Sequence, residues 1–267
     1  MSIVELAHLL GELSPHDRAL FDRIYHVVVT TGHVVPPPEM NKWLEAQFGT
    51  VDAVRRQKVV KVTNKVSLEG SLFNSLRASR PIEAVPGDQE LAAELERTSG
   101  GPFCQPENLT PADTFGRVRG QHSLTASNVA KYDGWHGVIV FDEHDPLSFE
   151  LEHVADYVET AQAWARRVHE LDPQACYPFF LWNCLWRSGA SILHGHAQMA
   201  LTKGMHYGRV EAWRRAAARY REMYGREYFA DLVTVYRALG LAVDHGRVSI
   251  LPSLTPVKEK EVYIISP

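Results

Sequence analysis

The sequence predicts an α+β fold, in which a sheet is packed with helices. Segments typical of strands, rich in β-branched residues or with alternating apolar residues, recur along the 267 residues. Segments with apolar residues at helical spacing lie between them. These helices have unequal lengths and no internal repeat relates them, which favours this class over a regular alternation of strands and helices.

Composition limits the classes of protein. Hydrophobic residues make up 45% and charged residues 22%, as in ordinary globular proteins. A formal net charge of −4 is not typical of a protein that binds nucleic acid non-specifically. No apolar run reaches the length of a membrane span, and no signal peptide is apparent. Cys104, Cys176 and Cys184 are too few for a disulfide framework. We expect a cytoplasmic protein without nucleic-acid or membrane partners.

The N-terminal residues 1–57 are predicted to form a helical extension that serves packing or dimerisation. Ser14 is a favourable N-cap, followed by Pro15 at the first helical position and Asp17 at the third. We expect this helix to continue until shortly before Gly32. The apolar residues at helical spacing are Leu20, Ile24, Val27 and Val28.

Residues 58–267 are predicted to form the second domain. Its first expected elements are strands over 58–62 and 65–73, a basic turn over 75–81, a helix over 89–96, a loop over 98–119, and strands over 121–127 and 135–141. A helix capped by Ser148 follows to about His169, with Val154, Tyr157, Val158, Ala161 and Trp164 on its inner face. The remaining expected elements are strands over 178–185 and 191–201, helices over 210–224 and 228–239, and strands over 247–251 and 261–266.

The stretch "SILHGHAQMAL" (191–201) concentrates polar groups on one face of its strand. Alternate side chains of a strand share a face. One face carries Ile192, His194, His196, Gln198 and Ala200, and the other carries Leu193, Gly195, Ala197, Met199 and Leu201. The second set suits a core, and the first presents two imidazoles and an amide.

A neutral imidazole can attack phosphorus if a hydrogen bond fixes its tautomer. A neighbouring amide such as Gln198 can donate to a phosphoryl oxygen as charge develops, and Gly195 would allow close approach. Taken alone, His-x-His is equally consistent with partly buried histidines or with metal binding.

The residues around His194 and His196 favour one of these interpretations. The pattern N-x5-GAS-x2-HGHAQ, from Asn183 to Gln198, resembles the active-site segment of the galactose-1-phosphate uridylyltransferase and diadenosine-tetraphosphate phosphorylase branch of the histidine-triad (HIT) superfamily. The resemblance implies a HIT-like fold, with an antiparallel sheet packed with helices, one full half of which follows the N-terminal extension. It makes His196 the nucleophile and Gln198 its phosphoryl-oxygen partner. The residues that it assigns to substrate binding or site order here are Asn183, Gly189, Ser191 and His194.

Further motifs occur in family order. "SLRASRP" is similar to the arginine turn of the family, so Arg77 and Arg80 are expected near the phosphates. "SNVAKYDG" implies that Asn128 holds the ribose, while "GPFCQPENLTP" and "GWHGVIVFDEHD" also resemble family segments. We expect the base pocket near Phe103, Asn108 and Tyr132.

The resemblance also implies a structural zinc site, one ligand of which is missing here. In many relatives two cysteines and two histidines bind it, and the resemblance assigns Cys104, His144 and His194 to this role. Gly101 replaces the fourth ligand, so the set falls short of a closed tetrahedral site. A water or another side chain could complete it, or the site could be empty.

The resemblance implies a nucleotidyltransferase with a nucleotidyl-histidine intermediate and no obligatory cofactor. Its substrates would be a nucleoside diphosphate sugar or dinucleoside polyphosphate and a phosphorylated acceptor. The main expected reaction is hexose-1-phosphate uridylyl transfer. Alternatives are an adenylyl-transferring phosphorylase of diadenosine tetraphosphate or ADP-sugar, a histidine-triad hydrolase, and a non-catalytic nucleotide or metal sensor. A homodimer is expected, and the chain is either a fragment or a minimal relative.

Overall fold

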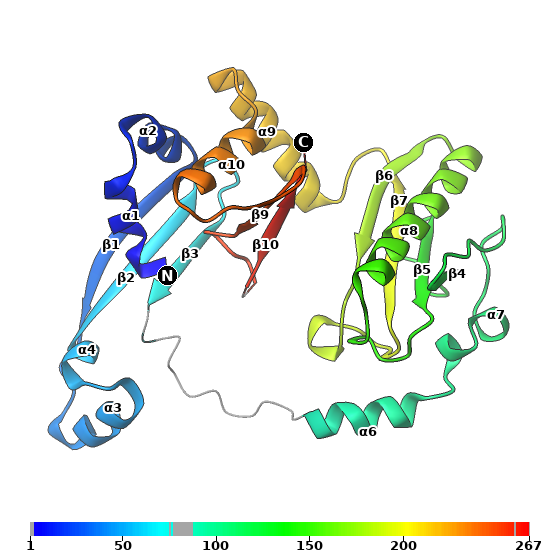
Figure 1. Ribbon diagram of the computed structural model, residues 1–267, viewed down its shortest axis with the longest axis horizontal. Helices are drawn as coiled ribbons and strands as arrows, with labels where there is room; N and C mark the ends of the chain where they lie inside the picture. The colour runs from blue at the N-terminus through cyan, green and yellow to red at the C-terminus, as the bar shows by residue number, and fades with distance from the viewer. Residues whose placement is uncertain (1–2, 75, 77–87, 259, 267) are drawn as a thin grey trace. The chain divides into compact units, whose positions relative to one another are not determined.

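The computed structural model describes residues 3–74, 76, 88–258 and 260–266 (Figure 1). The chain divides into two compact units, described separately below. Unit 1 comprises Met1–Glu83 and Ala212–Pro267, and unit 2 comprises Ala84–Glu211. Helices and antiparallel strands occur in both units, which confirms the predicted α+β class. Within the described residues, no helix combines the length and apolarity that crossing a membrane would require.

Unit 1 contains two three-stranded antiparallel sheets, in the orders β1-β2-β3 and β10-β9-β8. Its strands are β1 Tyr25–His33, β2 Arg56–Asn64, β3 Gly70–Asn74, β8 Val243–His245, β9 Val248–Pro252 and β10 Val262–Ile265. Its helices are α1 Leu6–Glu12, α2 Pro15–Ile24, α3 Asn41–Phe48, α4 Val51–Arg55, α9 Gly208–Tyr224 (whose first residues belong to unit 2) and α10 Tyr228–Ala238, with short 3-10 turns Ile3–Glu5 and Pro38–Met40.

The start of α2 is confirmed, but its predicted length is wrong. Ser14 Oγ accepts a hydrogen bond from the Asp17 backbone N–H at 3.1 Å. The helix ends at Ile24 instead of near Gly32, and β1 begins at Tyr25. The β-branched residues after Tyr25 fit strand geometry better than helix geometry, and β1 gains nine-residue pairing with β2.

The division into units differs from the predicted boundary between residues 57 and 58. Strand β2 crosses that boundary, and its Val60 and Val62 are fully buried in the core of unit 1. The same core contains Tyr228, Leu232 and other side chains of α10. Apolar side chains from both ends of the chain therefore build one core, which local patterns along the sequence do not reveal.

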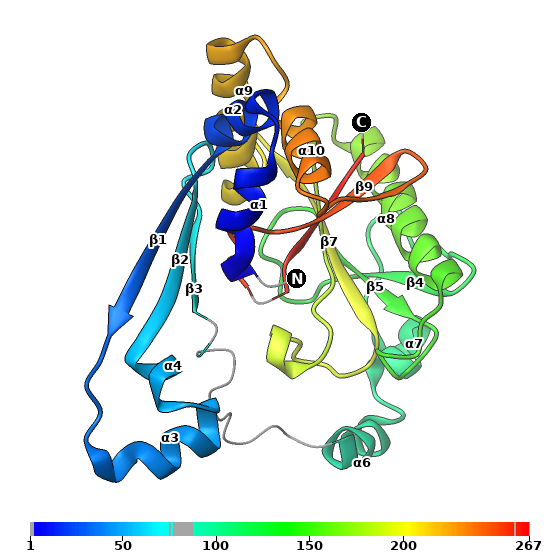
Figure 2. The same ribbon diagram turned by 60° about the vertical axis from the view of Figure 1, so that its left-hand side comes forward.

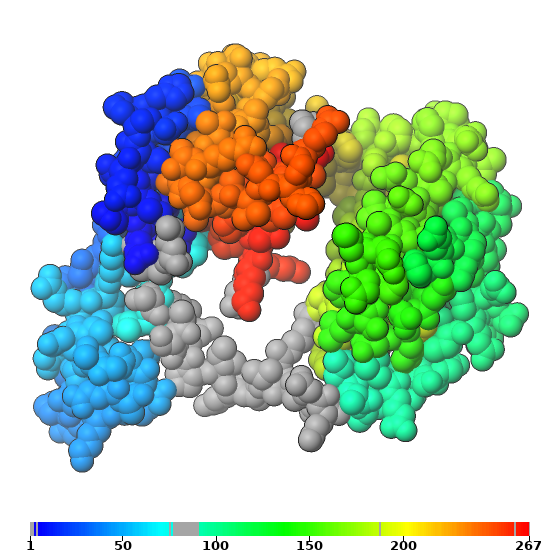
Figure 3. Space-filling model, in the orientation of Figure 1, coloured from blue at the N-terminus to red at the C-terminus, as the bar shows by residue number. Residues whose placement is uncertain are grey.

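Unit 2 contains a four-stranded antiparallel sheet in the order β4-β5-β7-β6. Helix α8 lies across one face of this sheet (Figures 1 and 2), and its green to lime side chains form part of the face of unit 2 seen in Figure 3. The elements are α6 Asp88–Thr98, η3 Pro102–Cys104, α7 Pro106–Leu109, β4 Ser123–Ser127, β5 His136–Phe141, α8 Leu151–Leu171, β6 Ala175–Leu181, η4 Trp186–Ser188 and β7 His196–Lys203.

Helix α8 differs in detail from its prediction. Its N-cap is Glu150, which forms a reciprocal capping box with His153, instead of Ser148. Tyr157 and Trp164 are buried as expected, whereas Val158 is 41% exposed. The buried stripe follows Tyr157, Thr160, Trp164 and Val168 at helical spacing, and Val158 lies about 100° around the helix from Tyr157, outside this stripe.

Strand β7 places its polar and apolar side chains on opposite faces of the sheet, although it begins at His196 and not at Ser191. Ala197, Met199 and Leu201 lie in the core that contains Tyr157 and Trp164 of α8. His196 and Gln198 pair in register with Val140 and Val138, whose side chains form a separate cluster with Phe103. The candidate site therefore lies on the sheet face away from α8.

Candidate active site

His196 is held in one tautomer by the backbone. Its Nδ1 lies 2.8 Å from the carbonyl oxygen of His194, and a carbonyl can only accept, so Nδ1–H donates. The Nε2 lone pair is left for a ligand. The residue is 8% exposed, and the Phe103 ring lies 5.1 Å from the imidazole, centroid to centroid. Burial lowers the pKa of His196, which favours the neutral ring.

A second histidine orients Gln198. The Tyr132 backbone N–H donates to Nδ1 of His136 at 3.3 Å, so Nε2 carries the proton. Nε2 donates to Oε1 of Gln198 at 3.0 Å, so its 3.2 Å approach to the Asn128 amide nitrogen, which is also a donor, is a contact and not a hydrogen bond. This leaves the amide NH₂ of Gln198 free to donate to a ligand. Burial lowers the pKa of His136 and keeps it neutral.

His136 was not predicted as a site residue. It lies within "GWHGVIVFDEHD", a segment already noted for its resemblance, but its role depends on strand register. Strands β5 and β7 pair His136 with Ala200, and this register brings its ring to Gln198. The only sequence signal is a histidine at the start of an otherwise apolar strand.

A cavity of about 330 Å³ opens beside His196 and Gln198. Its size falls in the range of small-molecule sites. It is lined by Pro102, Phe103, Leu109, Thr110, Pro111, Ser127, Asn128, Val129, Ala130, Val138, Ser191, Ile192, His196 and Gln198. The lining combines apolar side chains such as Phe103 and Val138 with polar ones such as Asn128, His196 and Gln198.

The predicted binding residues are distributed unevenly around this cavity. Asn128 lines it, and its Oδ1 accepts from the Ala130 N–H at 2.9 Å. Ser191 lines this cavity and the neighbouring one. Gly189 adopts φ 98°, in the left-handed region, and the Asn183 amide nitrogen lies 3.8 Å from the position of a Cβ built on it. Neither Gly189 nor Asn183 lines these two cavities.

Other predicted residues lie elsewhere or outside the description. Phe103 lines the cavity, whereas Asn108 does not. The Tyr132 ring lies against His136, with ring centroids 3.7 Å apart and the ring planes tilted by 41°. Arg77 and Arg80 lie outside the described residues.

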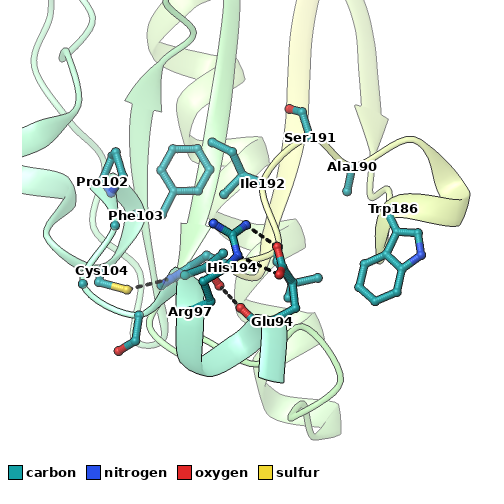
Figure 4. A pocket seen from close by; sticks show the side chains of 15 residues that line it. Glu94, Arg97, Pro102, Phe103, Cys104, Trp186, Ala190, Ser191, Ile192 and His194 are labelled. Atoms are coloured by element: carbon teal, nitrogen blue, oxygen red, sulfur yellow. Dashed lines mark hydrogen bonds and ion pairs between the residues drawn. The ribbon is translucent and has the colours of Figure 1, made fainter. Parts of the chain in front are cut away.

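A second cavity, of about 460 Å³, adjoins the first. Pro102, Phe103, Ser191 and Ile192 line both. Figure 4 shows Trp186 on the opposite side from Phe103, with Arg97 and Glu94 between them. The Arg97 guanidinium donates to the Glu94 carboxylate, with Nε–Oε2 at 2.8 Å.

The three residues predicted to bind zinc meet beside this second cavity. The Cys104 Sγ lies 3.3 Å from Nδ1 of His144 and 3.4 Å from Nδ1 of His194. The two Nδ1 atoms are 3.0 Å apart. Tetrahedral zinc, with bonds of about 2.0–2.1 Å to nitrogen and 2.3 Å to sulfur, places such ligand atoms about 3.3–3.6 Å apart. The group needs only a small expansion to hold the ion.

The outer contacts of both histidines also fit a metal. Nε2 of His144 lies 2.9 Å from the Leu95 carbonyl oxygen, and Nε2 of His194 lies 2.8 Å from that of Phe141. Each Nε2 therefore donates, which leaves each Nδ1 as an unprotonated ligand. Burial lowers the pKa of His194 as well.

The sequence matches no protein-family model and no curated protein. Its fold is similar to solved structures. One is an ADP-glucose phosphorylase from Arabidopsis thaliana with bound ADP-glucose, at 15% identity and TM-score 0.54 over 76% of this chain and 67% of that one. Another is a GalT-like protein from Arabidopsis thaliana, at 17% identity and TM-score 0.49 over 63% and 60%. A zinc-bound histidine triad family protein from Mycobacterium smegmatis has 17% identity and TM-score 0.35 over 48% and 97%.

The chain spans about two thirds of the length of the first two of these structures. The overlap with the phosphorylase includes more than the four-stranded sheet, since it covers 76% of this chain. At 15% identity this similarity concerns the fold. The chain thus shares its fold with this ADP-glucose phosphorylase.

Proposed function

We propose that the chain is a nucleotidyltransferase that works by double displacement on His196. The observation that carries this proposal is the bond from Nδ1–H of His196 to the His194 carbonyl, because it leaves Nε2 as a lone pair at the wall of a cavity of ligand size. A neutral imidazole so placed is a nucleophile and, once phosphorylated, a competent leaving group.

In the first step Nε2 of His196 attacks the α-phosphorus of the donor. A phosphorus–nitrogen bond forms, and the bond from the α-phosphorus to the bridging oxygen breaks, so that the sugar phosphate or nucleotide leaves with the electron pair. In the second step an oxygen of a phosphorylated acceptor attacks the same phosphorus and His196 leaves. The Gln198 NH₂ and the Ser191 hydroxyl would donate to the phosphoryl oxygens as charge develops. Arg77 and Arg80 remain predicted to neutralise phosphate charge.

Cys104, His144 and His194, together called the metal group, would support this site by positioning the backbone next to His196. A divalent ion on Nδ1 of His194 would fix the ring and, through it, the backbone at residue 194. That backbone provides the carbonyl which holds His196. The ion's role would then be to stabilise the fold around the nucleophile.

Hexose-1-phosphate uridylyl transfer is the main candidate reaction, and adenylyl transfer to phosphate is the second. The similarity of the fold to an ADP-glucose phosphorylase favours including the second. A non-catalytic nucleotide or metal sensor is the rival from another class, because it would bind in the same cavity without transfer.

The test is the intact mass of the protein after mixing with UDP-glucose, ADP-glucose or diadenosine tetraphosphate. We expect addition of UMP or AMP, which also identifies the base. His196→Ala should abolish the adduct, while His16→Ala, which removes an exposed histidine of unit 1, should retain it. Binding measured by calorimetry without any adduct would refute the transferase in favour of the sensor.

A further inference from the structure

The metal group opens onto the 460 Å³ cavity. Cys104 and His194 both line that cavity, and so does Gly101. Figure 4 shows Cys104 and His194 side by side at its wall, next to Phe103. Gly101 and Cys104 are the two ends of one turn, since the Cys104 N–H donates to the Gly101 carbonyl at 2.9 Å. The missing ligand position therefore belongs to the same turn as the cysteine that is present.

The three ligand atoms of the metal group require a positively charged partner between them. Both Nε2 atoms donate to carbonyls, so two Nδ1 lone pairs face each other at 3.0 Å. One thiol proton can serve only one of these acceptors at a time. A divalent ion satisfies both nitrogens and the sulfur together, and it would make Cys104 a thiolate.

The described residues provide three ligand atoms for this ion. No other ligand atom of a described His, Cys, Asp or Glu joins the group. The Thr98 hydroxyl lies near His144, but on the Nε2 side at 3.4 Å, away from the ligand nitrogen. The Glu94 carboxylate is occupied by Arg97. A four-coordinate ion would then have one position without a protein ligand.

We propose that the metal ion held by Cys104, His144 and His194 keeps a fourth coordination position open to the cavity, and that this position binds an anionic donor ligand from solution. One thiolate leaves a divalent centre with one net positive charge, which favours an anion over a neutral ligand. The cavity has the size of a small-molecule site, and its apolar wall of Pro102, Phe103, Ile192 and Trp186 can hold the body of such a ligand. This inference does not depend on nucleotidyl transfer.

Cobalt(II) substitution with azide as the probe tests the proposal. The full chain is stripped with a chelator, loaded with Co²⁺ and titrated with azide, while the visible ligand-field bands are recorded. We expect one Co²⁺ per chain, a thiolate charge-transfer band that Cys104→Ser abolishes, and a saturable shift of the ligand-field bands with azide. The cobalt content after desalting shows that azide has not removed the metal.

Gly101→Cys and Gly101→Ala form a matched pair. A Cβ at Gly101 would lie 3.2 Å from the Thr98 carbonyl oxygen, so both variants carry the same small steric change, and its φ of −65° permits a side chain. Only the cysteine adds a ligand. We expect Gly101→Cys to strengthen the thiolate band and to lose the azide response, and Gly101→Ala to respond like the wild type.

Three results would overturn the proposal. Failure to bind Co²⁺ would show that these residues do not form a metal site. Cobalt binding without an azide response would show that the coordination sphere is closed. An equal azide response in the wild type and both variants would show that the open position does not lie on the Gly101 side. The proposed transferase would be unaffected by any of these results, since its adduct is measured separately.

Discussion

A methyl group added at Gly195 should destabilise unit 2. A Cβ built there lies 2.7 Å from Cδ2 of Phe141 and 3.1 Å from the carbonyl oxygen of Glu143. Phe141 cannot easily move, because its ring is stacked on Tyr157 at 3.6 Å and meets Trp182 edge-on at 5.1 Å. The Gly195 N–H also donates to the His144 carbonyl. Overpacking of this kind costs about 1–3 kcal/mol, and we expect Gly195→Ala to lose that much free energy of unfolding.

Gly134→Ala is the control for the reduced conformational freedom that a Gly-to-Ala substitution causes in the unfolded chain. A Cβ at Gly134 meets no atom within 4 Å, and its φ lies outside the left-handed region. Alanine restricts the unfolded chain at both positions, which stabilises a compatible site by about 0.4–1 kcal/mol. Urea unfolding followed by tryptophan fluorescence measures both variants against the wild type. Equal stability of Gly195→Ala and Gly134→Ala would refute the view that Phe141 and Glu143 close tightly on Gly195.

Three other measurements address the site, the metal and the second sheet of unit 1. His136→Phe removes the hydrogen bond that orients Gln198, worth about 1–1.5 kcal/mol, so the rate of adduct formation should fall about 5- to 13-fold. The loss for Gln198→Ala should be about 10²–10³-fold, and equal losses would contradict a positioning role. Chelation should lower the urea midpoint of unit 2 and added Zn²⁺ should restore it, whereas an unchanged midpoint would argue against a bound metal. A hydrogen bond from Arg237 lowers the pKa of Asp244 from 3.8 to about 2. The stabilising effect of this ion pair is therefore complete above the unfolded pKa and disappears as the pH falls from about 4 to about 2. The stability difference between the wild type and Asp244→Asn should shrink over that range, and a constant difference would show that the pair does not act through charge.

Strong local signals made several elements predictable from the sequence. The serine–proline start of α2 and the apolar strand β5 are examples, because capping and alternation act between near neighbours. The two faces of β7 followed from alternation alone once the strand begins at His196. Residues 191–195 precede the strand and are not part of its pairing with β5, so the strand prediction was wrong for these residues alone.

Features that depend on distant partners were not predictable. Val27 and Val28 fit helical spacing as well as a strand, and only pairing with β2 decides between the two. His136 reaches Gln198 through the register of β5 on β7, which no local pattern encodes. The metal group joins residues up to 90 positions apart, and only the resemblance connected them beforehand.

The interruption of unit 1 by unit 2 has a consequence for synthesis on the ribosome. The 128 residues of unit 2 (84–211) take roughly 6–26 s to make at about 5–20 residues per second. During that interval the contiguous unit 2 can fold, whereas Val60 and Val62 still lack the α10 side chains that bury them. The nascent chain therefore has only apolar side chains of its first helices, such as Leu20 and Ile24, to cover these valines while the unit that carries His196 is completed.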